Sequence, residues 1–258
     1  MLTPTAVNDL EINNSFLQSV NINIGDTAQG HINYYYNHYK DTNDWYKFNS
    51  SVDGRISITM MVENGQNVFL ELFDGNGSTY LGGGYTTTST TWNIDGLAAG
   101  NYYLRVRTYY NNEYAPYKLT VGLTTPAFTI DAEINNSRAS ATLMQPNDSV
   151  TGHIGYYYNG YRDTFDYRKI TITQYGAVEW TIDVANGQNV YAQLFDNNAT
   201  TLLGGNYTTG TSTFTVDRLQ PGTYYLIIRC YYINSEFAPY GLKTKFYPVS
   251  PYDEVESN

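Results

Sequence analysis

The 258-residue chain contains one long internal repeat, and this repeat constrains the possible folds more than any other feature. Matching segments lie 122 residues apart: Thr3-Pro4 and Thr125-Pro126, Gly30-His31-Ile32 and Gly152-His153-Ile154, Tyr102-Tyr103-Leu104 and Tyr224-Tyr225-Leu226. Beyond Glu113, which matches Glu236, the offset becomes 123. A repeat of this length is too long for a solenoid unit and suits a complete domain. We therefore expect two tandem domains, residues 3–124 and 125–248.

The last ten residues, 249–258, stand outside this repeat. The segment Glu254-Val255-Glu256-Ser257-Asn258 has the acidic-x-acidic-x-Asn spacing found at Asp9 to Asn13 and again at Asp131 to Asn135. Residues 249–258 are therefore either the start of a further repeat or an unrelated acidic tail.

Each unit contains runs in which apolar and polar residues alternate, as they do in half-buried antiparallel strands. In the first unit these runs cover residues 44–49, 54–63, 68–74, 90–94, 102–110 and 117–122. Asp74-Gly75-Asn76-Gly77 has the composition of a hairpin turn. Because seven or eight short strands bury both apolar faces best in two facing sheets, we predict an all-β fold of two tandem jelly-roll-like antiparallel β-sandwich domains.

Charge and cysteine content exclude several classes of function. The 24 acidic and 14 scattered basic side chains give a net charge of −10, which offers no basic patch to nucleic acid or to an anionic membrane. The sequence contains no run of 18 apolar residues, so membrane insertion is not predicted. Cys230, the single cysteine, excludes an internal disulfide framework. The composition is typical of a secreted or cell-surface bacterial protein, with the signal peptide absent from this chain.

A set of ordered motifs resembles the bacterial pre-peptidase C-terminal domain, in tandem. The motifs are Asp9-x-Glu11-x-Asn13-Asn14, Gly30, Asp41-x-x-Asp44-Trp45-Tyr46-x-Phe48, Val68-x-Leu70-x-Leu72-Phe73-Asp74 and Leu97-x-x-Gly100-x-Tyr102-Tyr103-Leu104-x-Val106. The family is also similar to the collagen-binding domains of clostridial collagenases. The resemblance implies a non-catalytic jelly-roll sandwich in a secreted, multidomain bacterial protein.

Oxygen-bearing side chains suggest a structural calcium site in each unit. Calcium prefers six to eight oxygen ligands from carboxylates, amides and carbonyls. The resemblance implies ligands at the matching positions, namely Asp9, Glu11, Asn13, Asp41 and Asp44 in the first unit and Asp131, Glu133, Asn135, Asp163 and Asp166 in the second. The alternative is that these aspartates cap turns and form ordinary loop hydrogen bonds.

The 28 tyrosines exceed what two small cores require, so some must be exposed. Neighbouring residues of a strand face opposite sides, and exposed tyrosine can stack on a sugar or on a proline-rich helix. The resemblance places a ligand-binding ridge at Arg107 with Tyr109 and Arg229 with Tyr231. The full set of candidate ligand-binding residues is Tyr34, Tyr35, Tyr36, Tyr39, Tyr85, Arg107, Tyr109, Tyr156, Tyr157, Tyr158, Tyr161, Tyr207, Arg229 and Tyr231. Cross-strand packing is the alternative for these rings.

No catalytic constellation is predicted, so we expect no enzyme activity. His31 and His153 lie in strand contexts without a serine or cysteine motif, and Cys230 lies in an apolar strand. We predict a non-catalytic accessory module, monomeric within a larger chain, that binds an extended polymer, with polysaccharide as the first choice. The alternatives are a module that binds collagen-like or other fibrous protein for a peptidase, and a calcium-stiffened spacer.

Overall fold

The computed structural model describes residues 9–249 except 37, 159 and 234, and it leaves the side chains of Tyr36 and Tyr158 undescribed. The chain forms two compact units: Met1–Thr125 with Tyr157–Tyr161, and Pro126–Tyr156 with Arg162–Asn258. Residues 250–258, where a further repeat was considered, lie outside the described residues. Among the described residues, no helix has the length and apolar character needed to cross a membrane.

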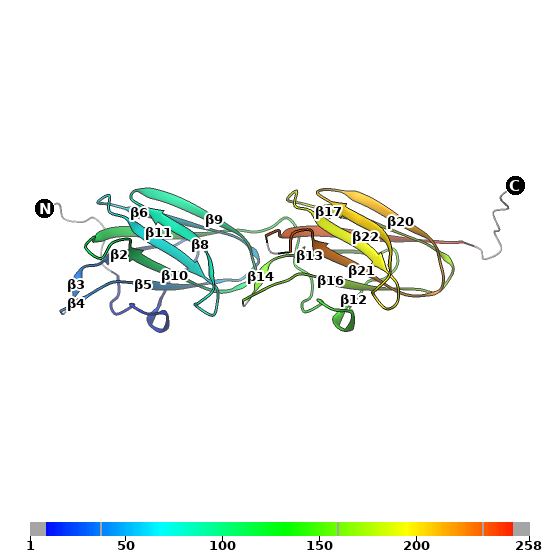
Figure 1. Ribbon diagram of the computed structural model, residues 1–258, viewed down its shortest axis with the longest axis horizontal. Coiled ribbons are helices and arrows are strands. Elements are labelled where there is room, and N and C mark those ends of the chain that lie inside the picture. Colours follow the sequence, from blue (N-terminus) through cyan, green and yellow to red (C-terminus); the bar gives the residue numbers. More distant parts are fainter. Residues whose placement is uncertain (1–8, 37, 159, 234, 250–258) are drawn as a thin grey trace. The chain divides into compact units, whose positions relative to one another are not determined.

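The first unit contains two facing sheets (Figure 1). The first sheet has the order β1 (Val20–Asn21), β5 (Asp44–Ser50), β10 (Gly100–Thr108), β7 (Val68–Phe73) and β8 (Tyr80–Thr86). In the second sheet, the adjacent strands are β9 (Ser89–Leu97), β6 (Gly54–Val62), β11 (Ala115–Thr124) and β2 (Thr27–Ile32). The hairpin of β3 (Tyr35–Tyr36) and β4 (Tyr39–Lys40) precedes β5, and a short 3-10 helix covers Phe16–Gln18.

The second unit repeats this arrangement. Its first sheet has the order β12 (Thr142–Leu143), β16 (Asp166–Ile172), β21 (Gly222–Cys230), β18 (Val190–Phe195) and β19 (Leu202–Thr208). The second has the order β13 (Ser149–Ile154), β22 (Ala238–Pro248), β17 (Gly176–Val184) and β20 (Ser212–Leu219). The remaining elements are η2 (Arg138–Ser140), β14 (Tyr157–Tyr158) and β15 (Tyr161–Arg162). These elements confirm the predicted all-β fold with two tandem β-sandwich domains.

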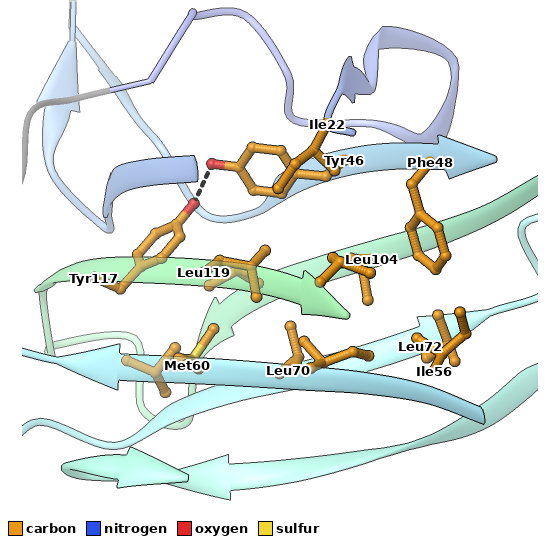
Figure 2. Packing of buried hydrophobic residues seen from close by; sticks show 14 of the residues in the cluster. Ile22, Tyr46, Phe48, Ile56, Met60, Leu70, Leu72, Leu104, Tyr117 and Leu119 are labelled. Atoms are coloured by element: carbon orange, nitrogen blue, oxygen red, sulfur yellow. Dashed lines mark hydrogen bonds between the residues drawn. The ribbon is translucent and has the colours of Figure 1, made fainter. Parts of the chain in front are cut away.

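The core of each sandwich is made by the inward rows of its strands. Along β6 every second residue is buried, so Ile56, Ile58 and Met60 face Leu70 and Leu104 of the opposite sheet. Figure 2 shows Ile56, Met60, Leu70 and Leu104 between the strands, with the hydroxyl groups of Tyr46 and Tyr117 facing each other. Period-two alternation is therefore the signal that correctly located most strands.

Two longer strands of the first unit, β2 and β8, lay outside the predicted runs, as did the two-residue strands β1, β3 and β4. Strand β8 contains three consecutive glycines, Gly82 to Gly84, which hide any alternation. A Cβ at Gly83, whose φ is +124°, would collide with the carbonyl oxygen of Leu70 on β7. The predicted turn at Asp74 to Gly77 does connect β7 to β8, and the amide of Gly77 donates to the Asp74 carbonyl (2.9 Å).

Gly30 on β2 leaves the space that the Tyr117 side chain occupies. A Cβ at Gly30 would collide with the Tyr117 hydroxyl and ring. A Cβ at Gly152 would likewise lie 2.5 Å from the Tyr240 hydroxyl. This close approach explains why the Gly-His-Ile motif is present in both units.

We expect Gly30→Ala to lower the free energy of unfolding of the first unit by about 2 kcal/mol, because the added methyl group overpacks a filled core. The matched control is Gly122→Ala on β11, where a Cβ meets its nearest atom at 3.6 Å. Urea denaturation of both variants measures the difference. Equal midpoints for the two variants would contradict the packing argument.

Candidate metal centre and aromatic surface

Five side chains of the first unit form a buried group that we call acidic cluster 1: Asp9, Glu11, Asn13, Asp41 and Asp44. Carboxylate oxygens of Asp9, Glu11 and Asp44 lie within 4.8 Å of one another. The Asn13 amide donates to Asp9 Oδ2 at 2.5 Å. Asp41 interacts electrostatically with Glu11 and Asp9 and by a hydrogen bond with Asp44. The structure therefore brings together all five residues that the sequence singled out in this unit.

Backbone contacts hold these side chains in place. Residues 9–14 form no strand, and the peptide bond between Glu11 and Ile12 is cis. The Trp45 amide donates to the Asn13 carbonyl (2.9 Å), which fixes this segment against the start of β5. The Asp41 amide donates to Tyr34 and its carbonyl accepts from Asn33, at 2.8 and 2.6 Å. An irregular segment and a loop thus meet at the first residue of a core strand.

Two buried hydroxyl groups connect acidic cluster 1 to both sheets. Tyr46 on β5 donates to Asp9 Oδ2 (2.7 Å), and Tyr117 on β11 donates to Asp44 Oδ2 (2.5 Å). The two hydroxyl oxygens are themselves 2.6 Å apart (Figure 2). Neither tyrosine was among the predicted site residues, because the sequence does not show that β5 and β11 bring the two hydroxyl groups to the same point.

Acidic cluster 1 brings several carboxylates together in a position that water hydrates poorly. Burial, and then the charges of Asp9 and Asp41, raise the pKa of Asp44 well above its ordinary value. Burial, and then the charge of Glu11, raise the pKa of Asp41 to about 7. Burial also raises the pKa of Asp9, against the lowering effect of its hydrogen bonds from Tyr46 and Asn13. Ionised carboxylates in this position require a cation.

The oxygen atoms of acidic cluster 1 fit a hard divalent cation. Asp9 Oδ1, Asn13 Oδ1 and Asp44 Oδ1 are buried and have no hydrogen-bond partner among the described residues. Asn13 and Asp44 are fully buried, and carboxylate oxygens of Asp44 and Asp9 belong to the group that lies within 4.8 Å. The donors are carboxylates and an amide without thiolate, which is the set that suits Ca²⁺ rather than a soft metal.

The second unit contains an equivalent group, acidic cluster 2: Asp131, Glu133, Asn135, Asp163 and Asp166. Oxygens of Asp131, Glu133 and Asp166 lie within 4.8 Å of one another, and the Asn135 amide donates to Asp131 Oδ2 (2.5 Å). Burial, and then the charges of Asp163 and Asp131, raise the pKa of Asp166 well above its ordinary value. The ten predicted metal-ligating residues thus form two groups, one in each unit.

Acidic cluster 2 differs by an arginine that the sequence analysis missed. Arg168 stands where the first unit has Tyr46, 122 residues earlier. Its Nη2 donates to Asp131 Oδ2 (2.5 Å) and to the Tyr240 hydroxyl (3.1 Å), and Tyr240 donates to Asp166 Oδ2 (2.7 Å). Alignment of the two repeats could have revealed this difference, because it pairs Tyr46 with Arg168.

The outer face of the first sheet of unit 1 displays an exposed group that we call aromatic cluster 1: Phe69, Tyr85, Tyr109, Tyr110 and Arg107. The Phe69 and Tyr109 rings stack at 5.5 Å, and Tyr85 lies 5.8 Å from Phe69 and 6.0 Å from Tyr109. Arg107 lies over the Phe69 ring at 4.5 Å. Cross-strand registry causes this grouping, because Phe69 is opposite both Arg107 and Tyr85.

Aromatic cluster 2 has the same arrangement in the second unit, with Tyr191, Tyr207, Tyr231, Tyr232 and Arg229. The Tyr191 and Tyr231 rings stack at 5.3 Å, and Arg229 lies over Tyr191 at 4.0 Å. Tyr207 lies 5.4 Å from Tyr231. The predicted ridge residues of both units thus lie beside further rings, such as Phe69 and Tyr191. These rings were not predicted as binding residues, because the sequence does not reveal the strand register.

The arginines of the two aromatic clusters have different partners. Arg105 and Arg107 both donate to Glu71 Oε2, at 2.7 and 3.0 Å. Although burial raises the pKa of Glu71, these two arginines lower it overall. Gln193 replaces Glu71 in the second unit, and the described residues offer Arg229 neither a hydrogen bond nor an ion pair. Among the described residues, Arg107 is therefore paired with a carboxylate and Arg229 is not.

The tyrosines of the predicted loops do not join either aromatic cluster. Tyr35, Tyr39 and Tyr161 are exposed, Tyr34 and Tyr157 are half-buried, and the side chains of Tyr36 and Tyr158 lie outside the described residues. Tyr156 was predicted to be exposed, but it is 3% exposed. It stacks on His153 (4.7 Å) and meets Phe237 edge-on (5.6 Å), so its expected role in ligand binding is wrong.

The residues set aside as structural lie in packed surroundings. The His153 ring contacts the Phe128 carbonyl at 2.5 Å, and His31 lies 4.9 Å from the Tyr34 ring. Cys230 is buried, and burial raises the pKa of its thiol to about 12. A thiol with this pKa is protonated at neutral pH and is a poor nucleophile.

Residues 42–108 match the family model of the bacterial pre-peptidase C-terminal domain, which confirms the resemblance. The matched segment lies in the first unit, and the internal repeat places the same motifs in the second unit.

Three solved structures illustrate the similarity. The pre-peptidase C-terminal domain of a Bacillus anthracis collagenase is 23% identical, with a TM-score of 0.32, and the match covers 40% of this chain and 93% of that one. The Aeromonas hydrophila inhibitor of g-type lysozyme, PliG, is 13% identical, with a TM-score of 0.28 and coverage of 42% and 97%. A Eubacterium rectale protein described as secreted is 12% identical, with a TM-score of 0.28 and coverage of 94% and 85%. Comparison with curated proteins gave no match.

The raised pKa values in acidic cluster 1 predict a pH dependence for the metal-free protein. A carboxyl whose pKa rises from 3.8 to about 7 on folding, as for Asp41, favours the folded state below 3.8 and loses this contribution as the pH rises through 7. In metal-stripped buffer, we therefore expect the free energy of unfolding of unit 1 to fall between pH 5 and about pH 7.5. Denaturant titrations across this range measure it, and the variant Asp41→Asn is expected to flatten the curve. A steady rise in stability with pH would contradict the assignment.

Proposed function

We propose that this chain is a tandem binding module that tethers a secreted bacterial protein to an extended polysaccharide, with calcium supporting the fold. The observation that carries the proposal is the exposed aromatic cluster with its arginine, present at the same place in both units. The fold itself does not require these rings, because both apolar cores are closed beneath them.

The chemistry of the aromatic clusters suits sugars. Tyr85 and Tyr110 are 62% and 55% exposed, and Tyr207 and Tyr232 are 49% and 59% exposed. Phenol rings present apolar faces to the C–H groups of a pyranose and hydroxyls to its polar edges. The guanidinium groups add N–H donors beside the rings, and Arg229 in particular has donors that no described residue engages. A surface of rings and donors fits a ligand that is apolar on its faces and polar on its edges.

Two similar clusters on one chain suit a repeating ligand. A polymer that engages one cluster holds further repeats near the other, so that two weak sites give a higher overall affinity. This advantage is available on a polysaccharide or a fibrous protein and absent on a small soluble ligand.

Calcium is proposed to complete the acidic clusters. The uncompensated oxygens of Asp9, Asn13 and Asp44 support this role. Bound calcium would supply positive charge to the buried carboxylates, while the protein side chains fix the segment at residues 9–14 against β5. The role is structural, because the acidic clusters lie at strand starts inside the sandwich and the aromatic clusters lie on an outer sheet face.

Retention assays distinguish the possible ligands. The full chain is passed over insoluble and gel-embedded neutral and acidic polysaccharides and over fibrillar collagen. We expect retention on at least one polysaccharide. Retention on collagen alone would redirect the proposal to a fibrous-protein ligand, and no retention on any matrix would favour the spacer alternative.

We expect the double variant Tyr109→Ala/Tyr231→Ala to lose about tenfold or more in retention, because central tyrosines dominate such surfaces. Its melting temperature should change little, since both rings lie outside the cores. The matched control is Tyr175→Ala/Tyr247→Ala, which removes two exposed tyrosines outside the aromatic clusters. Equal retention of the two double variants would count against the proposed surface.

Calcium is expected to raise the melting temperature of the metal-stripped chain. At about 100-fold above its dissociation constant, a ligand that binds only the folded state stabilises by about 2.7 kcal/mol, or roughly 10 °C for a domain of this size. Differential scanning calorimetry with calcium, with magnesium and with chelator measures the shift. Identical melts in calcium and chelator would refute the calcium role and leave polymer binding open.

A further inference from the structure

Acidic clusters 1 and 2 have the same carboxylates but different charge compensation. Position 46 carries a tyrosine hydroxyl, whereas the equivalent position 168 carries the guanidinium of a buried arginine. We propose that Arg168 is a built-in cation that takes the place of calcium in the second unit, so that the chain has one strong calcium site, in the first unit. This inference rests on the proposed calcium role and assigns it to one of the two clusters.

Arg168 is bound within acidic cluster 2 rather than beside it. Its Nη1 donates to Thr142 Oγ1 (2.7 Å), and its Nη2 donates to Asp131 Oδ2 (2.5 Å) and to Tyr240 (3.1 Å). Asp131 and Arg168 have side chains that are 4% and 5% exposed, so water does not screen the pair. A charge-assisted contact of this kind is held firmly in place.

The guanidinium also occupies oxygen atoms that remain available in the first unit. Asp131 Oδ2 accepts from Arg168 and Asn135, and Asp131 Oδ1 accepts from the His153 amide at 3.3 Å. The equivalent Asp9 accepts through Oδ2 only, and its Oδ1 is buried without a hydrogen-bond partner among the described residues. The second unit thus retains fewer oxygens for a metal.

The position of Glu133 also makes acidic cluster 2 a weaker metal site than acidic cluster 1. Glu11 is half-buried within acidic cluster 1, whereas Glu133 is exposed at the edge of acidic cluster 2. An exposed carboxylate is better hydrated and contributes less to holding a cation.

Electrostatics gives the expected size of the difference. A divalent ion entering acidic cluster 2 is repelled by a fixed positive charge within the same buried group, and such repulsion at short range weakens binding by about a hundredfold or more. In the first unit, Asp9 accepts hydrogen bonds from Asn13 and Tyr46, and Asp44 accepts one from Tyr117. Within the part of the chain that the structure describes, no arginine or lysine takes part in these contacts.

Isothermal titration of the metal-stripped full chain with calcium chloride tests the proposal. We expect one strong site per chain, and we expect Asp44→Asn to abolish it. Two strong sites of equal affinity, or a strong site that survives in Asp44→Asn, would overturn the inference while leaving a calcium role intact. No calcium binding at all would instead refute the proposed calcium role itself.

Exchange of the two residues gives a second test. Arg168→Tyr is expected to create a second strong site, and Tyr46→Arg is expected to remove the first with about a hundredfold loss of affinity. Lys169→Tyr is the matched control, because it removes an exposed positive charge from the same strand and should add no site. Circular dichroism establishes that each variant is folded. A folded Arg168→Tyr chain that gains no site, or a folded Tyr46→Arg chain that keeps its site, would overturn the assignment.

Discussion

Burial of like charges at the start of β5 and β16 is the constraint on which the rest of each unit depends. The inward row of β5 passes from Phe48 through Tyr46 to Asp44, so the apolar core continues directly into a carboxylate that is fully buried. Such a group destabilises the fold unless a positive charge accompanies it. The irregular N-terminal segment, the loop at Asp41 and the hydroxyl of Tyr117 all converge on this point, so its compensation determines how three separate segments stay together.

Much of this arrangement could be predicted from the sequence because it follows from period and repeat. Alternation located most core strands, and the repeat identified the same five candidate ligands twice. Strand β8 could not be found in this way, because its glycines replace side chains where β8 passes close to Leu70, Trp92 and Ile94. The partners of Tyr109 in its cluster were also hidden, since only the register of β7 with β8 and β10 places Phe69 and Tyr85 beside it.

Two residues show why sequence pattern alone was insufficient. Tyr34 and Tyr156 occupy equivalent positions in similar tyrosine-rich segments, yet Tyr34 is half-buried and Tyr156 is buried against Phe237, where the first unit has Tyr114. Arg168 was visible in the sequence as a replacement for Tyr46, but an arginine in an alternating strand is ordinarily exposed. The structure shows that the Arg168 side chain is buried and paired with Asp131, so the replacement adds a positive charge to acidic cluster 2.

Aromatic clusters 1 and 2 differ in their charged residues and agree in their rings. Between aromatic clusters 1 and 2, Glu71 becomes Gln193 and Arg105 becomes Ile227, while each ring position keeps a ring and the stacking arginine stays. Exposed rings contribute little to either core, so folding does not explain their retention. The proposed polymer ligand would account for it, because stacking on the same ligand needs the same arrangement of ring faces within each cluster. The ionic partners can vary, since they set the local charge around the rings and leave the stacking surface in place.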